Sequence, residues 1–481
     1  MTQESVKELE NLISERIIIL DGAMGSMLQE YKLSEILCLE KPELITKIHE
    51  AYLEAGADII STCSFNANAV SLASYNLADK AYEISRASGV LARAAADRFS
   101  AMGKKRYTAG SMGPTPKSVS FCPDINDPTK RSIGWDELEA SYYDNARGLL
   151  DGGVDLLLIE TIFDTVNAKA AIAAVMRLRE ERSMAIPMII SATIANSSGR
   201  LLSGQNIEAF AVSVAHAEPL ALGLNCSYGA ETILPHLSIL SAFTPYPVIC
   251  YPNAGLPTRI GDYYEGPENT AEHLKKYFEN RLVNIVGGCC GTTPDHISVI
   301  ARLAKNYSPR PITDFRSRGK PKHRFLSGLE AFPLPPDSVI LEGTYPMECF
   351  AEKSIVKTCG AINADKAKQL SNCIKNNSID DAVDIAVGIM DDGAKILPLY
   401  IDPDLTGGKE TICNFLNSAL FYPSIAHFPV MLECPDWEIL EAALKCIQGK
   451  SLVNVKNCKE GDGEFLRHLD AIRRLGAAIV K

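Results

Sequence analysis

The chain has 481 residues, 46% of them hydrophobic and 22% charged, with a formal net charge of −11; this composition is typical of a soluble globular enzyme and excludes wholesale disorder. The negative charge argues against nucleic acid as a main partner, and no apolar run reaches the ~18 residues of a membrane helix. Because the acidic start MTQESVKELE is no signal peptide, we predict a cytoplasmic protein without a membrane partner.

Short β-branched segments alternate with longer helical patterns along the first 305 residues. The predicted strands are 17–20, 58–60, 107–109, 155–159, 188–191, 221–224, 248–250 and 283–286, and the predicted helices are 42–55, 79–100, 135–150, 165–181, 206–216, 231–242, 270–279 and 294–305. Eight βα units predict a closed (β/α)8 TIM barrel in an α/β protein. A doubly wound open sheet is the alternative, but the turn after the first strand, Asp21–Gly25, lacks the GxGxxG pattern of dinucleotide-binding sheets.

A basic, Pro-rich stretch interrupts the alternation at 306–338 and predicts a linker or a wrapping segment. The second series has predicted strands at 339–341, 395–401, 429–432, 452–455 and 477–480, and predicted helices at 365–376, 378–391, 410–418, 437–448 and 464–475. Five units form only a truncated, partial (β/α) barrel. We therefore predict a barrel domain over 1–310, a linker over 311–338 and a partial α/β domain over 339–481. An open sheet edge after the fifth strand suggests homo-oligomerisation or a partner chain.

Unusual polar residues follow the strands of the first series, which is where the chemistry of an α/β barrel lies. These segments are Asp21-Gly22, 61–66, 111–114, Glu160-Thr161, 225–227 and 287–291. They bring Cys226, Cys289 and Cys290 to one rim. Since the chain has no export signal, its 14 cysteines indicate free thiols or metal ligands more than disulfides. Three thiolates with one open position are typical of a catalytic zinc site.

The Cys289-Cys290 doublet also has a plainer interpretation, two buried cysteines in a Gly-rich turn. A disulfide between neighbours would be strained, whereas flanking glycines allow both sulfurs to face one metal. Three thiolates quench the acidity of Zn²⁺ toward water, yet the ion can hold a fourth thiol as its thiolate. The expected reaction is attack by a substrate thiol on an electrophilic carbon. A zinc hydrolase is disfavoured because no histidine forms an HExxH pattern.

Six motifs resemble the homocysteine S-methyltransferase family over roughly residues 8–310, with most similarity to the homocysteine module of cobalamin-dependent methionine synthase. They are DGAMG at 21–25, TCSFNAN at 62–68, GSMGP at 110–114, Glu160-Thr161, GLNC at 223–226 and GGCCGTTP at 287–294. The resemblance implies that homocysteine, bound as a thiolate on Zn²⁺, accepts a methyl group to give methionine.

The resemblance also implies individual roles for the residues at these strand ends. Cys226, Cys289 and Cys290 match the family's zinc ligands, and Glu160 matches the carboxylate that holds the amino group of homocysteine. Asp21 matches a second polar contact to the amino acid, although it could instead cap its tight turn. Backbone amides around Ser111 are candidates for the substrate carboxylate, and Asn225 is expected to shape the site.

Residues 339–481 resemble the first part of the methyltetrahydrofolate-binding barrel of methionine synthase, mainly in 429–445 and 449–461. The expected polar loops are replaced by Glu342–Pro346, Pro398–Tyr400 and Glu433–Pro435, and only Asn454 is kept. Each lost partner leaves a polar ligand atom unpaired, at about 1–3 kcal/mol. We therefore predict that this part binds no folate and serves to cover hydrophobic surface or to mediate assembly.

The methyl donor is left open by the sequence. No Asp-x-His-x-x-Gly corrinoid loop occurs in the chain, and Asp295-His296 lacks the rest of that pattern. A separate methyl-corrinoid protein or methylcobalamin is the first candidate donor, and a small sulfonium or ammonium compound such as S-methylmethionine or betaine is the second. Another thiol acceptor, and a non-catalytic zinc- or thiol-binding subunit, stay as alternative functions.

Overall fold

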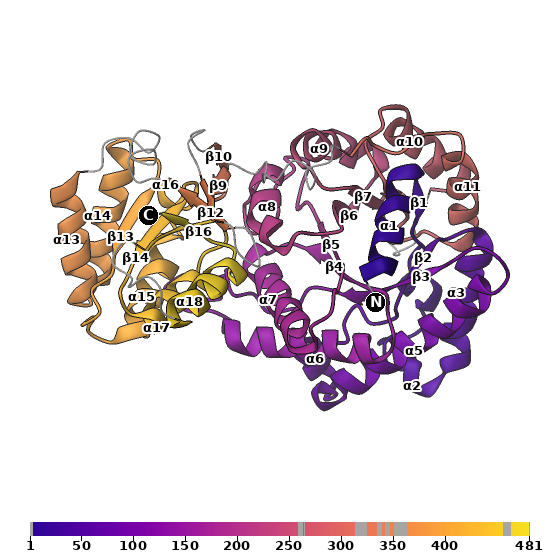
Figure 1. Cartoon of the computed structure of the whole chain (residues 1–481), viewed down its shortest axis with the longest axis horizontal. Helices are drawn as coiled ribbons and strands as arrows, with labels where there is room; N and C mark the ends of the chain where they lie inside the picture. Colours follow the sequence, from indigo (N-terminus) through magenta and orange to yellow (C-terminus); the bar gives the residue numbers. More distant parts are fainter. Residues whose placement is uncertain are drawn as a thin grey trace.

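The computed structural model describes residues 3–257, 263, 265–312, 325–333, 339–341, 347–350, 363–455 and 463–480. Its larger part is the predicted (β/α)8 barrel (Figure 1). The strands are β1 (Ile18–Ile19), β2 (Ile59–Ser61), β3 (Tyr107–Met112), β4 (Leu156–Ile162), β5 (Met188–Ala192), β6 (Ala221–Gly229), β7 (Val248–Asn253) and β8 (Ile285–Val286). All neighbours pair in parallel, and a bridge between Leu20 and Ile59 closes the ring.

Helices surround this barrel and pack apolar residues on its strands. They are α3 (Pro42–Ala55), α5 (Ala81–Ser100), α6 (Trp135–Asp151), α7 (Thr165–Arg182), α8 (Ile207–Val214), α9 (Ala230–Phe243), α10 (Pro267–Glu279) and α11 (Pro294–Ala304). Alternate strand residues serve two cores, since Leu156 and Leu158 fill the barrel interior while Leu157 and Ile159 face the helices.

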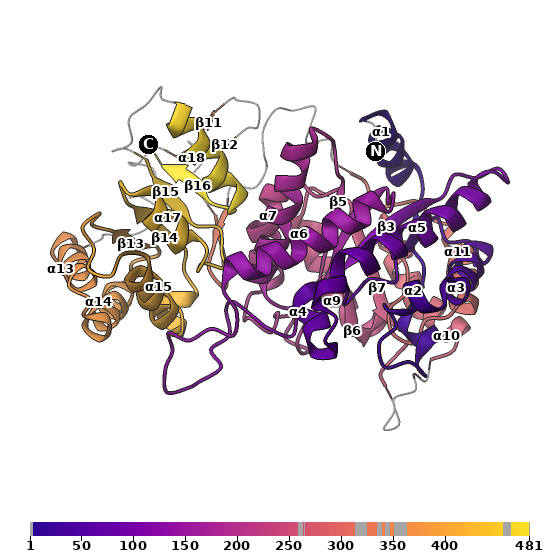
Figure 2. The ribbon, with the colours of Figure 1, turned by 90° about the horizontal axis from the view of Figure 1, so that it is seen from below.

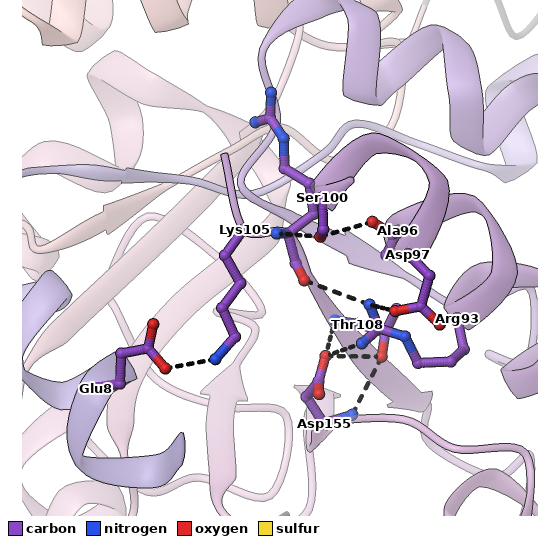
Figure 3. Close-up of polar contacts among 9 residues, drawn as sticks. Glu8, Arg93, Ala96, Asp97, Ser100, Lys105, Thr108 and Asp155 are labelled. Atoms are coloured by element: carbon purple, nitrogen blue, oxygen red, sulfur yellow. Dashed lines mark hydrogen bonds and ion pairs between the residues drawn. The ribbon is translucent and has the colours of Figure 1, made fainter. Parts of the chain in front are cut away.

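The amino ends of the strands are closed by a helix and by ion pairs. Helix α1 (Gln3–Glu15) lies across this end (Figure 2), and its Leu9 and Ile13 join the interior core. Figure 3 shows the charges around it: Arg93 contacts Asp155 at 2.5 Å, and Lys105 pairs with Glu8 of α1. Charged residues at this end of a barrel stabilise the fold, whereas the catalytic groups lie at the opposite end.

Asp58 is the buried centre of a second group of charges at the amino end. Its carboxylate contacts Arg16 at 2.7 Å and Lys104 at 2.6 Å, and accepts the Ile19 amide at 3.0 Å. Burial raises the pKa of Asp58, but the bonds from Arg16 and Lys104 outweigh it and hold the pKa below its ordinary value. The stabilisation is therefore present near neutral pH and is lost as pH falls through this lowered pKa.

We expect Asp58→Asn to lower the free energy of unfolding at pH 7 by about 3 kcal/mol, because it removes the fully buried carboxylate that joins Arg16 and Lys104. Urea unfolding followed by circular dichroism measures this. Asp97→Asn is the matched control, since Asp97 pairs with Arg93 but is 68% exposed, and its loss should change stability by less than about 1 kcal/mol. Equal midpoints for the two variants would show that Asp58 does not tie the barrel end together.

The smaller part is a six-stranded sheet in the order β11-β12-β16-β15-β14-β13, in which β11 is antiparallel to β12 and the other neighbours are parallel. Its strands are β11 (Val339–Leu341), β12 (Met347–Phe350), β13 (Leu397–Tyr400), β14 (Val430–Glu433), β15 (Leu452–Asn454) and β16 (Ala478–Val480). The helices are α13 (Ala364–Lys375), α14 (Ile379–Asp391), α15 (Gly408–Ala419), α16 (Pro423–Ala426), α17 (Trp437–Leu444) and α18 (Gly463–Arg474).

One expectation for this sheet is wrong. The sequence predicted an open edge after the fifth strand, β16, but β16 pairs with β15 on one side and with β12 on the other. Strand β12, which the sequence analysis did not predict, pairs with the side of β16 that was expected to be open. The edges among the described strands are β11 and β13. The altered loop Glu342–Pro346 lies outside the described residues.

The two sheets are joined by buried polar contacts. Lys169 on α7 is 1% exposed and donates to the carbonyls of Ile447 at 3.1 Å and Gly449 at 2.6 Å. Strands β9 (Phe325–Ser327) and β10 (Ala331–Pro333) form a hairpin between the two parts, within the predicted linker. Ser327 accepts the Lys450 amide at 2.9 Å, so this hairpin is bonded to the smaller part. The domain limits themselves stay predictions. No helix in the described part of the chain is long and apolar enough to span a bilayer.

Candidate active site

The carboxyl ends of the barrel strands surround a cavity of about 610 Å³. Six of the predicted site residues line it: Asp21, Ser111, Glu160, Cys226, Cys289 and Cys290. They come from the ends of five different strands, which converge only because the sheet closes into a barrel. Asn225 is the predicted residue that lies behind this wall, 1% exposed.

Cys226, Cys289 and Cys290 form a compact sulfur triad, with all three sulfurs within 4.8 Å of one another. The Cys226 and Cys290 sulfurs are 3.8 Å apart. A tetrahedral ion with Zn–S bonds of about 2.3 Å separates its sulfurs by about 3.8 Å. Strand β8 ends at Val286, so the doublet lies in a loop, and Gly291 has a φ of 81° that glycine adopts without strain. The triad therefore fits a zinc ion, and no other such group occurs among the described residues.

The three thiols cannot all ionise without a cation. Hydrogen bonds from Cys226 and Cys289 lower the pKa of Cys290 to about 3, so the protein itself stabilises one thiolate. The pKa of Cys226 is raised to about 12. A hydrogen bond from Cys289 lowers this pKa, but the donation of the Cys226 thiol to Cys290 and burial outweigh that effect. Bonding to the other two sulfurs and burial also raise the pKa of Cys289. A bound divalent cation would release these two protons.

Two buried carboxyl groups of the predicted site face the same cavity. Glu160, 8% exposed at the end of β4, accepts the Ser111 hydroxyl at 2.5 Å. Burial raises the pKa of Glu160 to about 7. Asp21 accepts the amide of Ser61 at 2.8 Å and its hydroxyl at 3.0 Å, and its pKa is raised mainly by burial and further by Glu160. None of the described residues lining the cavity is Lys, Arg or His, so neither carboxyl group has a cationic side chain beside it in this lining.

Ser111 makes two contacts inside the protein. Its amide donates to the Thr62 hydroxyl at 2.9 Å, and its side chain bonds Glu160. Ser111 therefore orients the carboxylate. The assignment of backbone amides around Ser111 to a substrate carboxylate stays a prediction.

Asn225 holds an unusual turn next to Glu160. Its Oδ1 accepts the Ser191 hydroxyl at 2.7 Å and the Thr161 amide at 3.1 Å, while its Nδ2 donates to the Thr161 hydroxyl at 2.8 Å. Thr161 has a φ of 57°, which is a rare conformation for a β-branched residue. The Asn225 amide thus fixes the strained residue that directly follows Glu160.

We expect Asn225→Ala to lower kcat/KM by about 10- to 100-fold, because Glu160 loses the turn that aims it. Steady-state kinetics with metal analysis measures this, and the metal content should not change. In the double variant with Thr161→Gly, glycine adopts the positive φ without support, so part of the activity should return. No recovery would mean that Asn225 acts in some other way.

Sequence reasoning missed several cavity residues, namely Tyr251, Tyr263 and Glu35. Tyr251 lies one residue beyond the predicted end of its strand, and β7 in fact continues to Asn253. A polar Tyr-Pro-Asn run directly after an apolar strand was the available signal. Glu35 carries no signal of its own, because its place depends on how its loop folds.

A closed (β/α)8 barrel with its reactive groups on the strand-end loops defines the chain as an α/β-barrel enzyme. The family model for homocysteine S-methyltransferase matches residues 18–304, and the chain belongs to this family. Among solved structures, the oxidized form of the homocysteine methyltransferase MmuM from Escherichia coli is 26% identical, with 60% of this chain and 95% of that chain covered and a TM-score of 0.48. The metallated form is 25% identical, with 61% and 98% covered and a TM-score of 0.48.

Proposed function

We propose that this enzyme transfers a methyl group to homocysteine to give methionine, with Zn²⁺ held by Cys226, Cys289 and Cys290. The observation that carries this proposal is the sulfur triad at one wall of a cavity whose other charged groups are acidic. When bound, zinc supplies a fourth position at which a substrate thiol is held as the nucleophilic thiolate.

The residues of the chain bind and orient the amino acid. Glu160 and Asp21 are buried carboxyl groups facing the cavity, and we assign them to the ammonium group of homocysteine. Ser111 and Asn225 keep Glu160 in place through the contacts described above. Because these groups are buried, each charge interaction with them is stronger than it would be in bulk water.

The first candidate for the methyl donor is methylcobalamin carried by a separate corrinoid protein, and S-methylmethionine or a betaine-type donor is the alternative. The acidic lining supports both, since neither requires a basic site. Methyltetrahydrofolate is disfavoured, because its carboxylates would meet no Lys, Arg or His among the described lining residues. Self-association through 339–481 also stays a proposal, with β13 as its candidate edge.

The donor is tested by incubating the zinc-loaded enzyme with homocysteine and one of four compounds: methylcobalamin, S-methylmethionine, betaine or methyltetrahydrofolate. Methionine is measured by mass spectrometry. Turnover with methylcobalamin alone supports the corrinoid route, and turnover with either onium compound alone supports the alternative. Methionine from methyltetrahydrofolate alone would contradict the donor assignment.

We expect the pH dependence of substrate selection to follow Glu160. Above its pKa of about 7 the carboxylate attracts the ammonium of homocysteine, and below it the neutral acid does not. The ratio of kcat/KM for homocysteine to that for 4-mercaptobutyrate, which lacks the amino group, should therefore fall as pH drops from 8 to 6. Both substrates carry a thiol, so the ratio of their kcat/KM values removes the effect of thiol titration. A ratio that is constant with pH would contradict the role of Glu160.

A further inference from the structure

Tyr251 is a buried polar residue whose role the activity proposed above does not explain. It lies near the carboxyl end of β7, is 2% exposed, and lines the cavity. Its side chain belongs to the core inside the barrel. The hydroxyl makes no hydrogen bond of regular geometry among the described residues, although Glu160 and Ser191 lie close enough to interact with it. Buried polar groups of native proteins are normally paired, so an unpaired hydroxyl facing a cavity indicates a partner that arrives with, or is moved by, a ligand.

The surroundings of this hydroxyl limit its partners. Glu160, Cys289 and Ser191 are the groups that act on it electrostatically, and the hydroxyl in turn lowers the pKa of Glu160. Tyr251 lines the same cavity as Glu160, the carboxylate assigned to the substrate ammonium, and as the three cysteines of the sulfur triad. Both ends of a bound homocysteine, its amino group and its thiol, would lie near this hydroxyl.

The carboxylate of Glu160 has room for a second donor. Its Oε1 accepts the Ser111 hydroxyl. A carboxylate has about four acceptor positions, so a donor on the other oxygen can fix its plane without displacing Ser111. The Ser191 hydroxyl already donates to Asn225 and is not available for this purpose.

We propose that Tyr251 is a positioning residue for substrate binding: its hydroxyl donates to the second oxygen of Glu160 when the amino group of homocysteine enters, and so holds the carboxylate toward that group. The inference rests on the proposed function, because it takes Glu160 as the ammonium site. It assigns Tyr251 a role in selecting amino-acid thiols over simple thiols, and none in binding the metal.

The test compares homocysteine with 4-mercaptobutyrate in the zinc-loaded Tyr251→Phe enzyme. We expect KM for homocysteine to rise about tenfold, the effect of one lost bond to a charged group, with kcat and zinc content unchanged. KM for 4-mercaptobutyrate should stay within about twofold, since it has no ammonium to present to Glu160. Tyr246→Phe is the matched control, because its buried hydroxyl donates to the Ala215 carbonyl at 3.0 Å and Tyr246 does not line the cavity; it should leave both KM values unchanged.

The double variant Glu160→Gln with Tyr251→Phe separates this role from general damage. If Tyr251 acts through Glu160, the double variant should be no worse than Glu160→Gln alone. Equal losses for both thiols, or losses that multiply in the double variant, overturn the role of Tyr251. If Tyr251→Phe matches wild type while Glu160→Gln is impaired, only the role of Tyr251 is overturned. If the wild-type enzyme methylates no homocysteine, the proposed function is overturned as well.

Discussion

Replacing Cys289 with alanine should abolish zinc retention and methyl transfer together. The variant leaves two sulfurs, and a site with two thiolates and no third protein ligand cannot hold the ion through desalting. We expect turnover to fall by about four orders of magnitude, because the substrate thiol then has no metal to lower its pKa. Metal analysis of the desalted protein and a methionine assay on the same sample measure both effects.

Cys250→Ala is the matched control for Cys289→Ala. Cys250 is a fully buried thiol on the neighbouring strand β7 and does not line the cavity, so its removal should leave zinc content unchanged. Circular dichroism shows whether each variant is folded. A folded Cys289→Ala enzyme that is free of zinc yet fully active would refute the role of the metal.

Glu160→Gln should lower kcat/KM for homocysteine by about 100- to 1000-fold, the loss of a buried charge-assisted bond. The amide has the same shape as the carboxylate but cannot neutralise an ammonium group. Zinc content should not change, because Glu160 is not part of the sulfur triad. The effect should appear mainly in KM, since the ammonium lies far from the transferred methyl group.

Glu35→Gln provides the comparison. Glu35 is another buried carboxylate lining the cavity, but it already accepts the Asn66 amide at 2.9 Å and the Asn66 side chain at 3.0 Å. Those bonds give it a structural role, and we expect its replacement to lower kcat/KM by no more than about tenfold. Similar losses in the two variants would show that the ammonium is not bound at Glu160.

The barrel was predictable from sequence because its signals are local. Short β-branched strand segments and helices with period 3.6 alternate along the first 305 residues, and the strand-end loops of a closed barrel must share one face. That constraint alone brings Cys226 toward Cys289 and Cys290. Their sulfur geometry required the loop after β8, whose backbone conformation a sequence pattern does not specify.

The errors arose where structure depends on non-local pairing. Strand β12 is four residues long, and only its pairing with β16, more than a hundred residues later, makes it an inner strand. The positive φ of Thr161 was equally hidden, because β-branched residues rarely adopt it and its support comes from Asn225 on another strand. Tyr251 was missed by one residue at a strand end.

The most direct test of the zinc-thiol mechanism is X-ray absorption at the zinc edge, recorded on the enzyme before and after homocysteine is added. The three cysteines predict three sulfur neighbours at about 2.3 Å and one lighter atom in the free enzyme, and four sulfurs with homocysteine present. The Cys226→Ser variant, if it retains zinc, should start from one sulfur fewer. A zinc shell that keeps three sulfurs while methionine is being formed would contradict the account, because the substrate thiol would then react without binding the metal.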